Sequence, residues 1–248
     1  MLSELNPHVR DKDISMNAET HTYTVKGKAY RGSVSTFLKL FFSKFDEKLA
    51  ITNILKSKNI NNPTYEYYGM NYEQIKKHWE NGKNLGTELH SYIEDYFNGK
   101  ERINNTVEYS YFKNFIRDYP NFIPYRTEFM IYHEQLRLVG CVDMLCIKPN
   151  GHFTLLDWKR SKRIDAYSFN NKCSTFPGLT HIPDCNFYHY TFQLNIYKYI
   201  LETCYDMIID EMYMVVFHPN NTNYKIYVIN TLQNEMNIIM DYRSKNLT

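Results

Sequence analysis

A β-hairpin spanning residues 141–159 constrains the fold of this chain most strongly. The runs Cys-Val-Asp-Met-Leu and Phe-Thr-Leu-Leu-Asp-Trp-Lys flank a Lys-Pro-Asn-Gly turn at residues 148–151. A Pro-Asn-Gly turn between two apolar runs is typical of antiparallel strands. In a hairpin centred near Asn150, Asp143 and Asp157 are expected to lie opposite each other, with Cβ atoms ~5 Å apart.

The end of this hairpin predicts a cluster of charges. Side chains two residues apart on a strand share a face, so we expect Lys159 beside Asp157, with Leu156 and Trp158 on the opposite face. Two unpaired carboxylates in a half-buried sheet would repel, and one would take up a proton. A bridging Mg²⁺ or Mn²⁺ removes this repulsion and keeps positions for water and phosphate. Lys159 would orient or activate the attacking water and offset charge on the phosphate.

The same residues also have a simpler interpretation. An Asp–Lys pair on a solvated hairpin face needs no metal, and short motifs carry false positives. The hairpin alone leaves both interpretations open, so the other motifs must decide between them.

Residues 83–97 are predicted to form a helix with two distinct faces. Its apolar positions recur at helical spacing: Leu85, Leu89, Ile93 and Tyr96 or Phe97. Gly86, His90 and Glu94 are spaced four residues apart and share a different face. That face can deliver a histidine and a glutamate to a metal site. The alternatives are an exposed His–Glu pair, or a histidine bonded to a backbone carbonyl.

Three strands are predicted after a second helix at residues 107–118. They cover residues 125–133, 136–147 and 153–159 and form a meander. Glu128 lies within the first strand. It is expected to support the site or bind its metal, or else to pair with Arg126 or Arg137.

The remaining segments complete an α/β pattern. A long loop is expected at residues 164–183, because the segment lacks periodicity. Three cations precede this loop and could contact phosphates: Arg160, Lys162 and Arg163. A helix at 187–203 carries Tyr190, Gln193, Leu194 and Tyr197 at helical spacing. Predicted strands at 211–218 and 224–230 and a helix at 232–242 follow. This order predicts a mixed β-sheet flanked by helices.

The first 82 residues are predicted to form a hairpin and a helical cap. We expect a polar, poorly ordered start over residues 1–20, a hairpin from His21 to Val34, and helices at 36–42, 46–58 and 72–81, the first capped by Ser35. The exposed lysines of this cap would guide a phosphate backbone or form an ordinary solvated face. The predicted division is therefore 1–82 for the cap and 83–248 for the core.

Composition restricts the function only broadly. A net charge of +2 indicates that any surface for nucleic acid is local. The five cysteines form no C-x-x-C pair, which favours a reducing compartment. No apolar h-region starts the chain, and no run approaches the ~20 apolar residues of a membrane helix. We therefore expect a soluble protein inside the cell, or a viral one acting there.

In this order, four motifs resemble those of a known nuclease family. They are Gly86-x-x-x-His90-x-x-x-Glu94, Gly140-x-x-Asp143, Asp157-Trp158-Lys159 and Gln193-x-x-x-Tyr197. Together they resemble the PD-(D/E)XK nuclease superfamily, in its RecB-like exonuclease branch. The chain is also similar to the mitochondrial genome maintenance exonuclease and to related phage or viral proteins. The resemblance covers roughly residues 83 to 205 and implies a restriction-endonuclease-like fold.

The resemblance implies roles for particular residues. The metal ligands would be His90, Asp143, Asp157 and the backbone carbonyl of Trp158, and Lys159 would be the catalytic lysine. Gln193 and Tyr197 match positions that help hold the DNA and that lysine. Glu94 and Glu128 match recurrent acidic positions of the branch.

The cysteines and histidines suggest two further kinds of metal group, an iron–sulfur cluster and a zinc site. Iron–sulfur members of the branch carry three close cysteines after the Gln-x-x-x-Tyr helix, whereas here only Cys204 follows it, so we expect no cluster. Cys173, His181, Cys185 and His189 could bind zinc, but their spacing is irregular for a tetrahedral site.

The expected function is a Mg²⁺- or Mn²⁺-dependent DNA exonuclease with little sequence preference. It would act on single-stranded DNA or free DNA ends in replication, repair or recombination, with unidentified protein partners and no membrane. Two alternatives remain: a catalytically silent module that binds DNA ends, and a structure-specific endonuclease of the same superfamily.

Overall fold

The fold is built on two β-sheets. A computed structural model describes residues 1–17, 19–20, 22–100 and 102–247. For residue 169, it describes the backbone but not the side chain. The larger sheet has the order β4-β5-β6-β7-β8, and the smaller has the order β1-β2-β3. Strands β6 and β7 are parallel, while the other neighbours in the larger sheet are antiparallel. The predicted mixed sheet is confirmed.

The strands have the following bounds: β1 Ile14–Asn17, β2 Thr22–Val25, β3 Lys28–Tyr30, β4 Ile123–His133, β5 Leu138–Ile147, β6 Phe153–Lys159, β7 Ile209–Val216 and β8 Lys225–Val228. Strand β6 has the predicted bounds. The last two strands had been predicted to end two residues later than they do.

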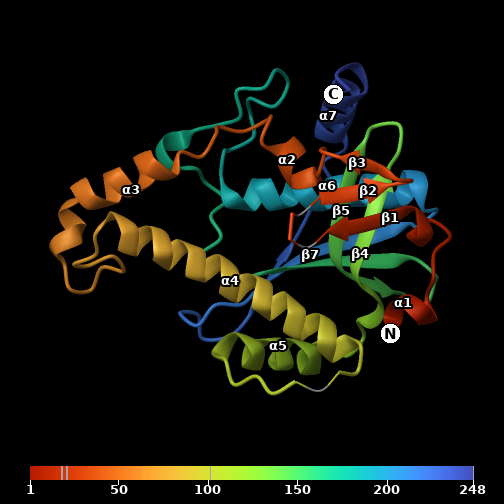
Figure 1. Ribbon diagram of the computed structural model, residues 1–248, viewed down its shortest axis with the longest axis horizontal. Coiled ribbons are helices and arrows are strands. Elements are labelled where there is room, and N and C mark those ends of the chain that lie inside the picture. Colours follow the sequence, from red (N-terminus) through yellow and green to blue (C-terminus); the bar gives the residue numbers. More distant parts are fainter. Residues whose placement is uncertain (18, 21, 101, 248) are drawn as a thin grey trace.

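Helices cover both faces of the larger sheet (Figure 1). The α-helices are α1 Leu2–Leu5, α2 Val34–Leu38, α3 Glu47–Lys56, α4 Tyr72–Phe97, α5 Val107–Asp118, α6 Asn186–Cys204 and α7 Gln233–Lys245. The short 3₁₀ helices are η1 Asp11–Asp13, η2 Lys58–Asn61 and η3 Phe169–Asn171. Helices α4 and α5 share one apolar cluster with the sheet, and α2, α6 and α7 share another. Among the described residues, no helix is long and apolar enough to cross a membrane.

The register of the central hairpin agrees with the sequence prediction. Met144 lies opposite Leu156, and Leu145 lies opposite Leu155. The pairing of β5 with β6 ends there: β5 continues beside β4, and β6 continues beside β7. The sheet therefore forks immediately after the Met144–Leu156 pair. Asp143 and Asp157 are the first residues beyond that pair.

The two faces of β6 are also as expected. Leu156 and Trp158 belong to the cluster that α4 and α5 cover, where the Trp158 ring meets Phe112 and Phe115 edge-on. Leu155 belongs to the cluster around α6. Alternation along β6 consequently directs Asp157 and Lys159 away from the Trp158 side.

Helix α4 corrects the prediction of two separate helices. It runs for 26 residues, and its Asn71 cap and Gln74 form a reciprocal capping box. Gly82, where the break had been expected, lies inside it. A single glycine costs a helix only about 1 kcal/mol, and strong helix formers surround this one. The predicted division between residues 82 and 83 thus falls within a continuous helix.

The N-terminal segment is more ordered than its polarity predicted. Residues 2–17 contain α1, η1 and β1. Asp11 forms an ion pair with Arg126 at 2.9 Å, and the guanidinium of Arg10 lies 3.9 Å from the ring centroid of Tyr132. These contacts with β4 stabilise the segment, and hydropathy could not reveal them.

Two further expectations for the N-terminal region need comment. Helix α2 begins at Val34, because Ser33 rather than Ser35 accepts the capping hydrogen bond from the Thr36 N–H group. The helix ends at Leu38. His21, predicted to start the hairpin, lies outside the described residues.

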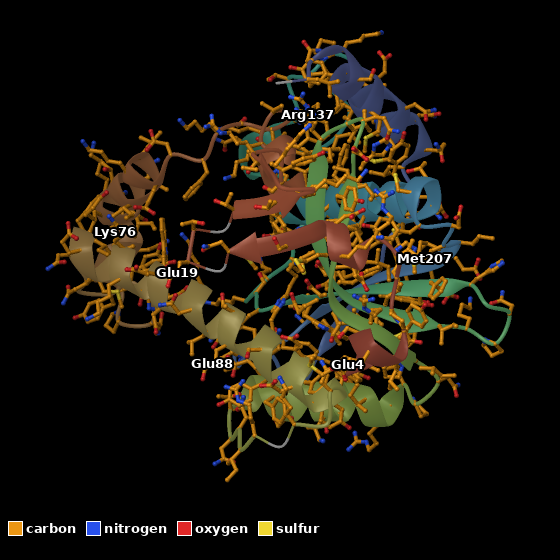
Figure 2. All side chains as sticks on the ribbon, turned by 45° about the vertical axis from the view of Figure 1, so that its right-hand side comes forward. Glu4, Glu19, Lys76, Glu88, Arg137 and Met207 are labelled. Atoms are coloured by element: carbon orange, nitrogen blue, oxygen red, sulfur yellow. The ribbon has the colours of Figure 1, made fainter. Side chains whose placement is uncertain are left out.

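Helix α3 and the first half of α4 form an arm beside the body of the protein (Figure 1). Figure 2 shows Lys76 on this arm, while Glu88 lies farther along α4 toward the body. The lysines predicted to line the cap are exposed: Lys39, Lys44, Lys48, Lys56, Lys58, Lys76 and Lys77.

Replacing Gly140 by Ala is expected to destabilise the fold. A Cβ atom there would lie 2.4 Å from Cε1 of Tyr197, so helix α6 or the ring must shift. Such overpacking costs about 1–3 kcal/mol. Urea denaturation measures the effect, and an unchanged stability would contradict this packing.

Gly82→Ala is the matched control. A Cβ atom at Gly82 meets nothing within 4 Å, so this variant should gain up to about 1 kcal/mol from helix propensity.

Candidate metal and phosphate site

The backbone of Trp158 lies at the centre of the site. Its N–H donates to Oδ2 of Asp143 at 2.8 Å, and its carbonyl lies 2.9 Å from Nε2 of His90. The N–H is available because β5 and β6 have separated at the fork. Since Nε2 of His90 donates to the carbonyl, Nδ1 is the ring nitrogen that faces the carboxylates.

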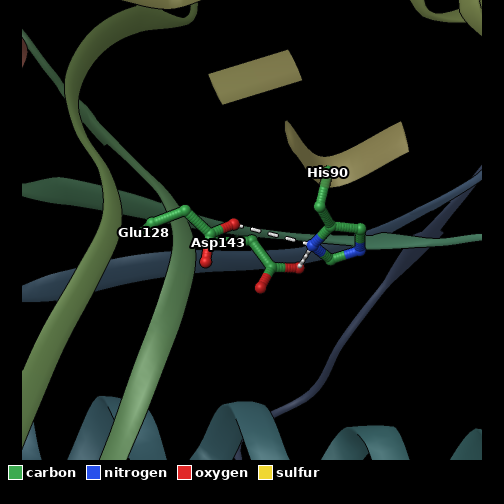
Figure 3. A group of neighbouring side chains, drawn as sticks. All are labelled: His90, Glu128 and Asp143. Carbon is green, nitrogen blue, oxygen red and sulfur yellow. Dashed lines mark ion pairs between the residues drawn. The ribbon is translucent and has the colours of Figure 1, made fainter. Parts of the chain in front are cut away.

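His90, Glu128 and Asp143 form a cluster that could hold a metal ion (Figure 3). Nδ1 of His90 lies 3.6 Å from Oε1 of Glu128 and 3.7 Å from Oδ2 of Asp143. Neighbouring ligands of an octahedral Mg²⁺ or Mn²⁺ lie about 3 Å apart, given bonds of about 2.1 Å. A small inward movement of the three side chains would therefore form part of such a shell.

The net charge of this cluster depends on whether His90 is protonated. Burial alone would lower the pKa of His90, but the carboxylates of Asp143 and Glu128 raise it to about 9. At neutral pH the imidazolium therefore supplies the positive charge between these carboxylates. A divalent cation bound at Nδ1 must displace that proton.

An unusual backbone conformation positions Glu128. Its neighbours Thr127 and Phe129 pair with Met144 and Val142, which places Glu128 opposite Asp143. The φ angle of Glu128 is +44°, in the left-handed region. Such conformations cost of order 1–3 kcal/mol and cluster at functional sites. Glu128 contacts His90 and accepts a weak hydrogen bond from Cys141, while Arg126 pairs with Asp11 instead.

Asp157 pairs with Lys159 rather than joining the cluster. Nζ of Lys159 lies 2.6 Å from Oδ2 of Asp157, whose side chain is only 2% exposed. The contact lacks the direction of a good hydrogen bond, so this buried oxygen is incompletely satisfied. Burial raises the pKa of Asp157 to about 6, although Lys159 opposes the shift.

Lys159 is held as an ammonium ion. Burial alone would lower its pKa, but the carboxylates of Asp157 and Asp143 outweigh that effect and raise it. Its side chain is 16% exposed, and Nζ lies 4.9 Å from the ring centroid of Tyr190. This ammonium can attract phosphate oxygens, but it cannot act as a base, because the raised pKa keeps the nitrogen protonated while both carboxylates are ionised.

Helix α6 brings the Gln-x-x-x-Tyr residues beneath the fork. The Gln193 amide donates to the Tyr197 hydroxyl at 3.0 Å, one helical turn along. The buried Tyr197 ring packs against Gly140, where a side chain would collide with it. The glycine of Gly140-x-x-Asp143 thus permits close contact between α6 and β5.

Glu94 lies near the cluster but outside it. Burial raises its pKa, and the negative charge of Glu128 adds to that effect. Both glutamates line a separate cavity of about 260 Å³, which also includes Asn98 and Arg126.

A larger cavity of about 790 Å³ opens beside Lys159. Helix α4 contributes His78, Trp79 and His90, and the chain after β6 contributes Arg160 and Lys162. It is large enough for part of a nucleic-acid backbone, and its lining supplies several cationic or titratable nitrogens.

Each of the three predicted phosphate-binding cations contacts a carboxylate. Arg160 binds Glu108 at 2.7 Å, Lys162 binds Glu66 at 3.2 Å, and Arg163 binds Asp165 at 2.7 Å. Of the three, Arg160 and Lys162 line the larger cavity. Glu66 and Glu108 could not be predicted from the sequence, because both are remote along the chain and no motif marks them.

The proposed zinc ligands have other contacts. His181 lies 2.9 Å from Glu235, and His189 lies 2.8 Å from Asp184. Within the described part of the chain, the group that meets the geometric requirements for a metal is His90, Glu128 and Asp143.

Comparisons with known proteins place few limits on this chain. No family model matches it. No curated protein matches it. Among solved structures, it is similar to SSO0001 at 16% identity, covering 57% of this chain and 59% of that one, with a TM-score of 0.29. It is also similar to a proposed exonuclease from Eubacterium rectale at 14% identity, covering 87% and 77%, with a TM-score of 0.39. Similarity at such low scores does not bear on the function of this chain.

Replacing His90 by Gln is expected to change how stability depends on pH. The pKa of His90 in the folded protein, about 9, exceeds the ordinary value of 6.5, so protonation stabilises the folded state. That contribution is fully present below about pH 6.5 and is lost as the pH rises through about 9.

Urea denaturation in metal-free buffer measures this contribution. The stability of the wild type should fall relative to His90→Gln by at most about 1.4 kcal/mol per pH unit across that window. Parallel curves for the two proteins would contradict the charge assignment.

Proposed function

We propose that this chain is a metal-dependent deoxyribonuclease of the PD-(D/E)XK superfamily, in its RecB-like branch. The observation that carries the proposal is the forked sheet, where a His–Glu–Asp cluster lies beside a buried Asp–Lys pair. The favoured activity is exonucleolytic hydrolysis of single-stranded DNA or DNA ends, with little sequence preference. Its setting would be replication, repair or recombination.

The donor set fits a divalent cation held by His90, Glu128 and Asp143. Bound there, Mg²⁺ or Mn²⁺ would polarise the scissile phosphate and lower the pKa of a water molecule. Asp157 and the carbonyl of Trp158 would complete the set of oxygen donors after a local rearrangement. Asp157 now pairs with Lys159, and the carbonyl now accepts from His90. The side chains of His90, Glu128 and Asp143 would also orient the phosphate.

Lys159 would act as a fixed positive charge. Its ammonium group would bind the reacting phosphate and position the attacking water. Asp157 and Tyr190 hold that group from two sides. Gln193 and Tyr197 would support the lysine and the DNA strand from helix α6.

When substrate binds, the cations beside the larger cavity would exchange their carboxylate partners for DNA phosphates. Arg160 and Lys162 face the larger cavity but are neutralised by Glu108 and Glu66. A DNA phosphate would compete with these carboxylates, most readily at the more exposed Lys162–Glu66 pair. Arg163 would contact the strand farther along. The cap of residues 1–82 would form one wall, and the core of residues 83–248 would carry the chemistry.

A silent DNA-binding module is the principal alternative. Burying Asp157 costs free energy, and its incompletely satisfied oxygen adds to that cost. A module that only binds DNA would gain nothing from this arrangement, so it favours catalysis. A structure-specific endonuclease would use the same groups, and only its products would distinguish it.

Replacing Lys159 by Ala should abolish cleavage. Loss of the buried ammonium removes charge stabilisation at the phosphate, and we expect the rate to fall at least about a hundredfold. End-labelled single-stranded and duplex DNA, digested with Mg²⁺, Mn²⁺ or EDTA, measures the effect.

Lys148→Ala is the control for that experiment. Lys148 lies at the opposite end of the same hairpin and pairs with Asp210, so its removal should leave the rate unchanged. Binding of DNA without cleavage by the wild type would favour the silent module. Cutting of circular single-stranded DNA would favour the endonuclease.

The mixed donor set should bind Mn²⁺ more tightly than Mg²⁺. Imidazole suits transition metals, whereas Mg²⁺ prefers oxygen ligands alone. Glu128→Gln should weaken Mn²⁺ binding by about tenfold or more, because it removes a charged ligand. Isothermal titration calorimetry measures both affinities. Glu88→Gln, an exposed change on α4, is the control. Equal affinities for Glu128→Gln and the wild type would contradict the assignment of Glu128.

A further inference from the structure

A third cavity, distinct from the two described above, lies on the α6 side of Lys159. It has a volume of about 490 Å³ and lies between the segment around α2 and helix α6. Its walls are mainly apolar and aromatic, and they include Leu38, Phe42, Phe45, His189, Tyr190 and Gln193. Apart from Tyr190 and Gln193, the residues that line this cavity have no part in the chemistry proposed above.

The cavity shares two of its side chains with the surroundings of Lys159. The ring of Tyr190 lines the cavity and lies 4.9 Å from Nζ of Lys159. Gln193 also lines it and donates to the hydroxyl of Tyr197. A group inside the cavity would therefore contact a ring that also lies beside the ammonium of Lys159.

An aromatic ring that lines this cavity lies close to a ring that lines the larger cavity. Phe45 lines the apolar cavity, and its ring centroid lies 6.0 Å from that of Trp79, which lines the larger cavity. The side chain of Phe45 is unusually accessible for a phenylalanine, since the residue is 68% exposed. On the inner wall, Phe42 lies 4.2 Å from the ring of His189. One ring from each cavity thus meets at the Phe45–Trp79 pair.

We propose that the apolar cavity binds one unpaired nucleobase next to the reacting phosphate. This proposal rests on the nuclease function proposed above. Flat aromatic walls suit a base, because each base has a π-face that can stack whatever its identity. Exposed Lys39 and Lys44 also line the cavity and can attract the flanking phosphates.

The cavity selects against duplex DNA. A base inside a double helix is covered on both faces by its neighbours and cannot enter a pocket unless it is unpaired and unstacked. Phe45 would close the outer side of the cavity by stacking on the bound base.

Phe45→Ala tests the proposal with little risk to folding, because the side chain is largely exposed. The probes are a fluorescent oligothymidylate, an abasic oligomer of equal length, and a duplex. Fluorescence anisotropy in EDTA measures binding without cleavage. Tyr68→Ala is the control, since Tyr68 is also exposed, at 52%, and lies outside the residues that line this cavity.

The wild type and Tyr68→Ala should bind the oligothymidylate roughly tenfold more tightly than the abasic oligomer. Phe45→Ala should lose most of that preference while binding the abasic oligomer as the wild type does. An unchanged preference in Phe45→Ala would overturn the base pocket. Equal binding of both oligomers by a wild type that still cleaves DNA would overturn it and leave the nuclease function standing. No cleavage and no binding by the wild type would overturn both.

Discussion

The site depends on the backbone of one residue, Trp158. Its N–H fixes the carboxylate of Asp143, and its carbonyl fixes the imidazole of His90. Both contacts exist because β5 and β6 separate after the Met144–Leu156 pair, which leaves the N–H and the carbonyl of Trp158 without a partner on the β5 side. The buried Trp158 ring anchors this backbone among Phe112 and Phe115. Packing on one face of the sheet therefore sets the geometry of charged groups at the fork.

The charges around the Trp158 backbone are nearly balanced before any ligand binds. Three carboxylates, from Glu128, Asp143 and Asp157, lie beside the cations of His90 and Lys159. In the proposed function, a divalent cation would take the place of the His90 proton, and a phosphate would take the place of the Asp157 carboxylate beside Lys159. The proposed reaction would replace both internal contacts with external ones. Such an arrangement keeps buried charges paired at each stage, which limits the cost of their desolvation.

Local patterns in the sequence predicted the core of the fold well. The turn and the apolar alternation were sufficient for the register of the hairpin and for the Asp157–Lys159 contact. Features that depend on distant packing were missed or left open. The continuity of α4 through Gly82 and the left-handed backbone of Glu128 reflect neighbours that no local pattern specifies. The Asp11–Arg126 pair likewise orders a segment that its polarity had suggested would be poorly ordered.

Spectroscopy of bound Mn²⁺ tests the central claim most directly, namely that His90, Glu128 and Asp143 hold a divalent cation. Electron spin echo envelope modulation detects a nitrogen atom coordinated to Mn²⁺. The wild type should show one such nitrogen, from Nδ1 of His90, and His90→Gln should not. Spectra of both proteins that show only water and oxygen ligands would contradict the assignment of the metal site.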